Sequence, residues 1–143
     1  MERKRILIAD AHPAMLDGVR ALLKDMFDVM FMVANDQSLM EAVARVQPDL
    51  VIVDLSMPVF SGGNVARLLQ RVSPEQRFII LSAHDEQTVI DECLAAGAKG
   101  FVLKRTAVID LIPAVEAVLR GETYVSPSIT EEKGNVNRQA TRE

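Results

Sequence analysis

The chain has 143 residues, of which 49% are hydrophobic, 25% charged and 4% aromatic. This composition is typical of one globular domain and argues against a disordered or low-complexity chain. There are 16 Lys and Arg residues against 20 Asp and Glu residues, so the net charge is −4 and no overall basic surface is available for clamping nucleic-acid phosphates. The single cysteine, Cys93, excludes an internal disulfide framework and is typical of a reducing compartment.

The sequence contains no recognisable targeting or membrane segment. The first apolar run, residues 6–9, ends at Asp10 and is too short for the core of a signal peptide. No stretch approaches the roughly 20 apolar residues that a membrane helix needs. We therefore expect a soluble, cytoplasmic protein without membrane contact.

Five short apolar runs, most of them rich in β-branched residues, predict β-strands. Four of the five are apolar on consecutive residues, which is typical of strands buried on both faces of a sheet. The second run is rich in methionine and suggests an edge strand. The runs are residues 5–9, 29–33, 50–53, 78–81 and 101–103.

Between the runs, apolar residues recur every three or four positions and predict amphipathic helices. Pro13 suits the first turn of the first helix, and Ser38 is a candidate cap of the second. Gly97 and Gly121 are expected to end the fourth and fifth helices. Pro113 either kinks the fifth helix or indicates that this helix begins later than residue 106. The helical patterns cover residues 15–26, 39–46, 65–69, 89–96 and 108–119.

This alternation predicts an α/β fold, in which right-handed crossovers place helices on both faces of a parallel sheet. The character of the sequence changes after Gly121, because residues 122–143 hold few apolar side chains and two charged clusters. We expect a polar tail or linker there, with Tyr124 and Val125 docking its start on the domain.

Polar residues end four of the apolar runs. Asp10 and Asp54 follow the first and third runs, and Ser82 and Lys104 follow the fourth and fifth. Each residue alone has an ordinary explanation, such as a turn former, a helix cap or a solvated strand end. Together they are more informative, because the carboxyl ends of parallel strands lie side by side and form the edge where open α/β sheets bind ligands. The sequence predicts one pocket with two carboxylates, a hydroxyl and an ammonium group.

This set of groups suits a phosphoryl group and a hard divalent cation. Mg²⁺ accepts carboxylate, carbonyl and water oxygens and is often shared with phosphate oxygens. A carboxylate can also be a nucleophile that forms an aspartyl phosphate, while Lys104 and Ser82 hold the phosphoryl oxygens. A nucleotide pocket is disfavoured, because no glycine-rich phosphate loop follows the first run.

At these positions the sequence resembles the receiver domain of bacterial two-component response regulators. The resemblance spans about residues 4–120 and rests on ILIAD at 6–10, PDLVIVDLSMP at 48–58, Gly62, ILSA at 80–83 and GAKGFVLK at 97–104. It implies a flavodoxin-like, doubly wound (βα)5 sandwich with a five-stranded parallel sheet of order 2-1-3-4-5 and helices on both faces. We therefore expect a receiver domain over residues 1–121 and the polar tail or linker over residues 122–143.

The resemblance also implies roles for single residues. Asp54 would accept a phosphoryl group from a sensor histidine kinase in a reaction that requires Mg²⁺. Lys104 would bind the phosphate, Ser82 would be the switch hydroxyl that moves toward it, and Phe101 would be the switch aromatic.

The metal ligands implied by the resemblance are Asp10, Asp54 and the backbone carbonyl of Ser56. The family usually has two consecutive acids after the first strand, whereas Ala11 stands here in the place of the second. Removing a carboxylate at about 4 Å forfeits roughly 4 kcal/mol per unit-charge pair at a surface-like dielectric, before water fills in. We therefore expect weakened Mg²⁺ binding, and weakened phosphorylation with it, unless Asp10 shifts to compensate.

The segments at residues 10–13 and 121–127 resemble receivers that precede a LuxR-type helix-turn-helix domain. The residues after 127 are too few and too polar for such a domain, so we expect the output domain to be absent, in a shortened chain or a stand-alone receiver. The resemblance implies a homodimer through the first and fifth helices or the fourth and fifth, and DNA contact only through an output domain.

Three functions remain as hypotheses. The first is a phosphorylation-controlled receiver in which the region of Ser82 and Phe101 changes an interaction surface and so controls transcription. The second is a pseudo-receiver, an interaction or dimerisation module whose phosphate chemistry has lapsed with Ala11. Neither is an enzyme beyond self-phosphorylation and self-dephosphorylation. The third, a small phosphohydrolase or phosphotransferase, is disfavoured because no segment remains for a substrate pocket.

Three further residues are expected outside the chemistry. His12 is interpreted as a loop or cap residue and not as a metal ligand, because no Cys and His cluster accompanies it. His84 follows the predicted switch hydroxyl and either lies in a solvated loop or lines the mouth of the pocket. Cys93 lies on the apolar side of a predicted helix and is expected in the core.

Overall fold

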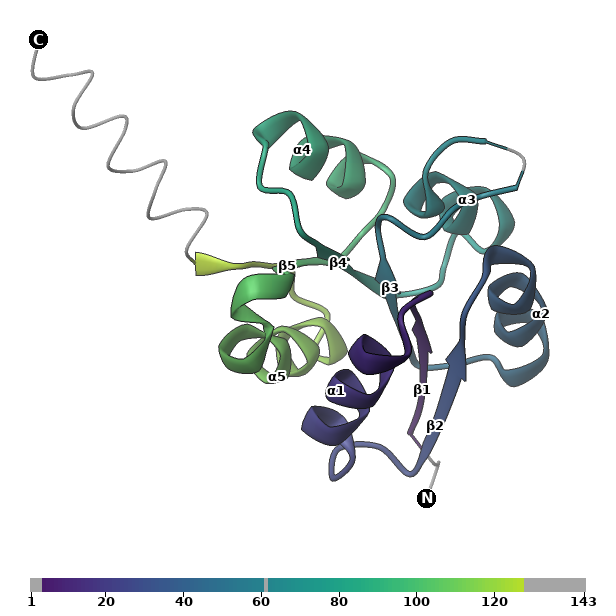
Figure 1. Ribbon diagram of the computed structural model, residues 1–143, viewed down its shortest axis with the longest axis vertical. Helices are drawn as coiled ribbons and strands as arrows, with labels where there is room; N and C mark the ends of the chain where they lie inside the picture. The colour runs from purple at the N-terminus through teal and green to yellow at the C-terminus, as the bar shows by residue number, and fades with distance from the viewer. Residues whose placement is uncertain (1–3, 61, 128–143) are drawn as a thin grey trace, which may run out of the picture.

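The computed structural model describes residues 4–60 and 62–127, and within them six parallel strands form one sheet (Figure 1). The order is β2-β1-β3-β4-β5-β6, so the predicted order 2-1-3-4-5 is confirmed and a short sixth strand is added beyond β5. The methionine-rich β2 lies at the opposite edge, as predicted. The strands are β1 (Arg5–Ala9), β2 (Val29–Val33), β3 (Leu50–Asp54), β4 (Phe78–Ser82), β5 (Gly100–Leu103) and β6 (Tyr124–Val125).

Helices cover both faces of the sheet, with α1 and α5 on one face and α2, α3 and α4 on the other (Figure 1). A 3-10 turn, η1 (Lys104–Thr106), joins β5 to the last helix. The α-helices are α1 (Pro13–Leu23), α2 (Asp36–Val46), α3 (Val65–Val72), α4 (Gln87–Ala95) and α5 (Ala107–Leu119).

The alternation of side chains along the central strands divides the core in two. Val51 and Val53 of β3 pack into the cluster under α2, α3 and α4, whereas Leu50 and Ile52 pack into the cluster under α1 and α5. Both faces are therefore apolar, which explains why the central strands are consecutive apolar runs. Cys93 belongs to the first cluster, as expected, and burial, with a smaller effect of Glu92, raises the pKa of its thiol to about 11.

The ends of the helices follow the predicted punctuation with one correction. Pro13 is the first residue of α1, and Gly97 and Gly121 adopt φ angles of 100° and 89° just after α4 and α5. Ser38 is not the cap of α2. The Asn35 side chain caps this helix by accepting a hydrogen bond from the Ser38 N–H at 2.8 Å. The first turn of α2 is polar, so the apolar pattern of the sequence predicts this helix only from its second turn.

Pro113 lies inside α5, which begins at Ala107. The helix therefore includes the proline and does not start after it. Pro113 is exposed, so the hydrogen bond that proline cannot donate is lost on the outer side of the helix and not in the core. Among the described residues, no helix has the length and apolar character that crossing a membrane requires.

Candidate functional site

Two buried carboxylates meet at the carboxyl edge of the sheet. Asp54 is the last residue of β3, and Asp10 directly follows the neighbouring strand β1. Each is only 1% exposed. Lys104 follows β5 and extends its ammonium Nζ to 3.0 Å from Asp54 Oδ1 and 3.8 Å from Asp10 Oδ2. The sheet topology thus brings together three of the four polar groups that the sequence places at strand ends.

Both oxygens of Asp54 are engaged by hydrogen-bond donors. The Ser56 backbone N–H donates to Oδ1 at 3.0 Å, and the Ser56 hydroxyl donates to Oδ2 at 2.8 Å. Burial raises the pKa of Asp54, but the Lys104 ammonium and the two Ser56 donors together outweigh burial and lower this pKa below its usual value. Asp54 is therefore an ionised carboxylate in a buried place.

In the described part of the chain, only one oxygen of Asp10 accepts hydrogen bonds. Its Oδ1 accepts a hydrogen bond from the His12 backbone N–H at 2.8 Å and lies 3.0 Å from His12 Nδ1. Its Oδ2 is buried and has no hydrogen-bond partner among residues 4–60 and 62–127, although the Lys104 ammonium lies 3.8 Å away. Buried polar atoms normally have a partner, so this orphaned oxygen marks a place where a cation would be stabilised.

His12 is at a cap position, as interpreted from the sequence, and its side chain also lies in the site. It occupies the N-cap position of α1, but its side chain makes no cap hydrogen bond. Its Nδ1 lies 3.8 Å from Asp54 Oδ2 as well as next to Asp10. The sequence signal that was missed is its position two residues after Asp10 and directly before Pro13, which starts the helix.

Ser82 lies at the same edge, but no hydrogen bond joins it to Asp54 in the described residues. It is 1% exposed, and its hydroxyl donates to the His84 carbonyl at 3.1 Å and accepts from the His84 N–H at 2.9 Å. The His84 ring is exposed, with Nδ1 3.8 Å from Glu86, as expected for a solvated loop. Phe101 is fully buried in the core cluster under α4.

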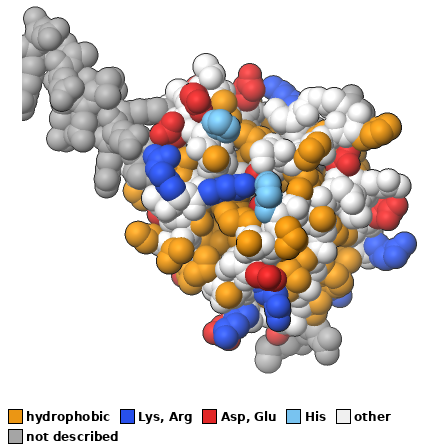
Figure 2. Space-filling model, in the orientation of Figure 1, with side chains coloured by type: hydrophobic (Ala, Val, Ile, Leu, Met, Phe, Trp, Pro, Cys, Tyr) orange, Lys and Arg blue, Asp and Glu red, His pale blue; other side chains and the backbone are white. Residues whose placement is uncertain are grey.

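The residues of the site fit a divalent cation. One ligand atom each from Asp10, His12 and Asp54 lie within 4.8 Å of one another. Two carboxylates against one ammonium leave one uncompensated negative charge beside the orphaned Asp10 oxygen. Figure 2 shows a histidine side chain at the end of an extended Lys or Arg side chain near the middle of the face that it draws. The site can therefore bind a cation and present an ionised carboxylate as a nucleophile.

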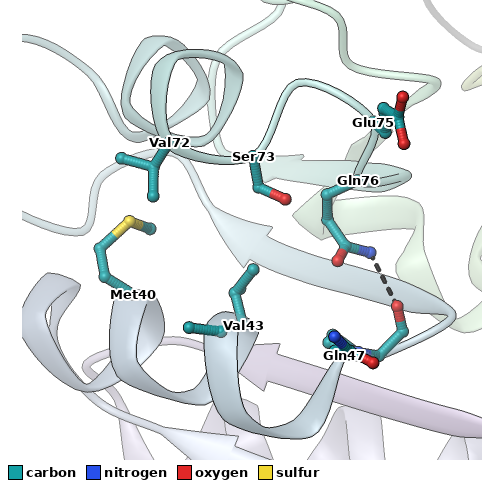
Figure 3. A pocket seen from close by; sticks show the side chains of 9 residues that line it. Met40, Val43, Gln47, Val72, Ser73, Glu75 and Gln76 are labelled. Atoms are coloured by element: carbon teal, nitrogen blue, oxygen red, sulfur yellow. Dashed lines mark hydrogen bonds between the residues drawn. The ribbon is translucent and has the colours of Figure 1, made fainter.

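A hollow of about 330 Å³ lies at the amino edge of the sheet, between the end of α2 and the connection from α3 to β4 (Figure 3). The Gln76 side-chain amide crosses it and donates to the Pro48 carbonyl at 3.0 Å. Glu75 is the single ionisable residue in its lining, so the hollow lacks the paired groups of the carboxyl edge. The lining residues are Met40, Val43, Ala44, Gln47, Pro48, Val72, Ser73, Glu75 and Gln76.

Comparison with curated proteins finds transcriptional regulators. The chain is 32% identical over 127 residues to the transcriptional regulatory protein MctR of Rhizobium johnstonii, covering 87% of this chain and 59% of that protein. It is 36% identical over 145 residues to the oxygen regulatory protein NreC of Staphylococcus epidermidis, covering 97% of this chain and 66% of that protein. The chain thus spans less than two thirds of the length of these relatives.

Solved structures agree with the sequence relatives. The RcsB response regulator of Salmonella typhimurium superposes with a TM-score of 0.83 at 26% identity, covering 92% of this chain and 67% of that one. The isolated receiver domain of RcsB, solved with the phosphomimetic BeF3−, gives a TM-score of 0.81 at 25% identity over 91% of this chain and 98% of that one. The family model of the response regulator receiver domain matches residues 6–116. The chain therefore belongs to the receiver domains of two-component response regulators.

Proposed function

We propose that this receiver takes a phosphoryl group from a sensor histidine kinase onto Asp54. The observation that carries the proposal is the ionised Asp54 carboxylate, buried yet held charged by Lys104 and Ser56. In the transfer, a carboxylate oxygen of Asp54 forms the new O–P bond and the P–N bond of the kinase phosphohistidine breaks. The electron pair of that bond returns to the imidazole nitrogen, which takes up a proton.

The neighbours of Asp54 have complementary roles in this proposal. Lys104 Nζ lies 3.0 Å from the Asp54 carboxylate. After the transfer, this ammonium group would bind the phosphoryl oxygens, which then carry the negative charge. A divalent cation, proposed as Mg²⁺ held by Asp10, Asp54 and the Ser56 carbonyl, would neutralise phosphoryl charge when bound. The buried Asp10 Oδ2, which accepts no hydrogen bond from the described residues, supports a cation at this place.

Ser82 and Phe101 are proposed to transmit the change. The Ser82 hydroxyl would exchange its two bonds to the His84 backbone for one to a phosphoryl oxygen, which moves the loop before α4. Phe101, buried on β5 under α4, would respond to that movement. The output in this proposal is a changed surface on α4 and α5 that alters self-association.

The wider organisation is also a proposal. Residues 1–121 would form the receiver and residues 122–143 a polar linker whose start is docked through β6. RcsB has been solved in complex with DNA. For this protein, DNA contact and transcription control would need an output domain outside this chain. The domain itself would be a phosphoacceptor in the cytoplasm and not an enzyme with a separate substrate.

Intact mass spectrometry after incubation with acetyl phosphate and Mg²⁺ tests the proposal. We expect the wild type to gain the mass of one phosphoryl group and Asp54→Asn to gain none, because the amide is not a nucleophile. Asp17→Asn, which removes the same charge from an exposed position of α1, is the matched control and should behave as wild type. A phosphoryl adduct that persists in Asp54→Asn would overturn the assignment of Asp54.

The second candidate, the pseudo-receiver, is favoured by one observation. Ala11 is exposed and offers no ligand next to Asp10. If the absence of a carboxylate at position 11 limits phosphorylation, Ala11→Asp should increase the yield of the adduct. Ala14→Asp, which adds the same charge in the first turn of α1, should not. If neither the wild type nor Ala11→Asp gains a phosphoryl group, the protein is a phosphorylation-independent module.

A further inference from the structure

The imidazole of His12 places a nitrogen atom beside the carboxylate oxygens of Asp10 and Asp54. We infer that His12 supplies a ligand in place of the carboxylate absent at Ala11 and makes the site prefer a divalent transition ion that binds imidazole, such as Co²⁺ or Zn²⁺, over Mg²⁺. This inference rests on the cation site of the proposed function and names the class of cation that the site takes.

The spacing of the three side chains fits shared coordination. His12 Nδ1 lies 3.0 Å from Asp10 Oδ1 and 3.8 Å from Asp54 Oδ2, and one ligand atom of each residue lies within 4.8 Å of the others. Two ligand atoms that bind one ion at right angles, with bonds of about 2.1 Å, lie about 3 Å apart. Small rotations of the side chains therefore suffice to place all three around one ion.

The backbone holds His12 in this place before any ion binds. Its N–H donates to Asp10 Oδ1 at 2.8 Å, and its position before Pro13 is fixed by the start of α1. The ring itself is 68% exposed, so water can complete the coordination sphere. Binding through Nδ1 replaces the ring contact with Asp10 and leaves the ring proton on Nε2.

The charges of the site decide the class of ligand. Asp10 and Asp54 are opposed by the single ammonium of Lys104, and the orphaned Oδ2 of Asp10 is buried beside it. A divalent ion neutralises this excess negative charge and leaves one positive charge in excess. Mg²⁺ prefers oxygen ligands and keeps several waters, whereas imidazole suits transition ions. A set of two carboxylates and one imidazole therefore selects against Mg²⁺.

Metal titrations of the untagged protein without any phosphodonor test this inference. Co²⁺ binding is followed by its visible absorption and Mg²⁺ binding by calorimetry. The informative quantity is the change in the Co²⁺ to Mg²⁺ affinity ratio that each variant causes, because this change isolates the contribution of the imidazole. We expect His12→Ala to weaken Co²⁺ binding about tenfold or more and Mg²⁺ binding less than about threefold. His12→Asn, which suits the N-cap position and offers an amide oxygen, should also lower the ratio.

His84→Ala is the matched control, because it removes the other histidine of the chain from an exposed loop of the same protein. It should leave the ratio unchanged. The inference is wrong if His12→Ala leaves Co²⁺ binding unchanged, weakens both ions equally, or has the same effect as His84→Ala. Because no phosphodonor is present, an unchanged Co²⁺ to Mg²⁺ affinity ratio in His12→Ala overturns only this inference. Absence of the phosphoryl adduct in the mass experiment, with Mg²⁺ and equally with Co²⁺, overturns only the proposed function.

Discussion

At the scale of single residues, Asp54 combines burial with a retained charge. Burial alone would favour the neutral acid, but Lys104 and Ser56 provide three donors that favour the carboxylate. The Asp54 pKa is lowered in the folded protein. Its contribution to stability is therefore complete above the unfolded-state pKa of about 3.9 and is lost as the pH falls through the folded-state pKa.

Removal of the ammonium should make stability depend on pH in a defined direction. Lys104→Met leaves Asp10 and Asp54 as two uncompensated buried carboxylates, so we expect a loss of roughly 2–4 kcal/mol in the free energy of unfolding at neutral pH. The pKa of Asp54 should rise. The loss should shrink as the pH approaches about 4, because protonation removes the uncompensated charge. Urea unfolding of both proteins across this pH range measures the effect.

Lys99→Met, the same substitution at an exposed position before β5, is the control and should change stability little at any pH. A Lys104→Met protein whose deficit grows toward acid pH would contradict the electrostatic account of the site.

The residues of the site were predictable to different extents. Asp10, Asp54 and Lys104 follow apolar runs, and parallel pairing of those runs brings their ends together, so their convergence could be read from the sequence. His12 could not be placed in this way, because its position depends on the turn after Asp10 and on the hydrogen bond of its N–H to that carboxylate. Ser82 was predicted at the edge, but its hydroxyl is occupied by the His84 backbone, a local turn that apolar patterns do not report.

At the scale of elements, β6 extends the sheet beyond the expected helical end of the receiver. Its backbone pairs with β5, and the buried Ser126 hydroxyl accepts a hydrogen bond from the Leu103 N–H at 3.0 Å. The Tyr124 hydroxyl donates to Asp110 at 3.3 Å. The expectation that Tyr124 and Val125 dock the start of the tail is confirmed. The strand itself is too short for apolar periodicity to reveal it.

Tyr124 reports directly on this docking, because it is the single tyrosine of a chain without tryptophan. Burial raises the pKa of its phenol, and the charge of Asp110 and their hydrogen bond raise it further. We expect ultraviolet titration of the tyrosinate to give a midpoint above the usual value of about 10. Asp110→Asn should lower this midpoint, whereas Glu116→Gln, at an exposed position of the same helix, should not. An unshifted wild-type midpoint would show that β6 is not docked in solution.

At the scale of the whole molecule, the candidate site and the exposed apolar side chains lie on different parts of the fold. The carboxyl edge of the sheet holds the ionised groups, whereas α5 carries apolar side chains on its outside. Val108 and Ile109 at the start of α5 are 77% and 76% exposed. Burial of exposed apolar side chains against a partner is energetically favourable, so these two residues support the proposed self-association through α5.

Self-association through α5 predicts a response to added charge. We expect the double variant Val108→Glu, Ile109→Glu to reduce dimer formation in sedimentation velocity measurements over a concentration series, with its circular dichroism unchanged. Val72→Glu is the control, because Val72 is 50% exposed on α3, on the other face of the sheet. Equal dimer fractions in the wild type and the double variant would show that α5 is not the interface.

The central claim is that Asp54 is the phosphoryl acceptor of a receiver domain, and binding of beryllofluoride tests it without any transfer step. We predict that the wild type, given beryllofluoride and a divalent cation, shows new bound signals in ¹⁹F NMR, because the ionised Asp54 carboxylate, Lys104 and the cation complete the site. Asp54→Asn should show free ligand only. Bound signals of equal intensity in Asp54→Asn, or none in either the wild type or Ala11→Asp, would contradict the account.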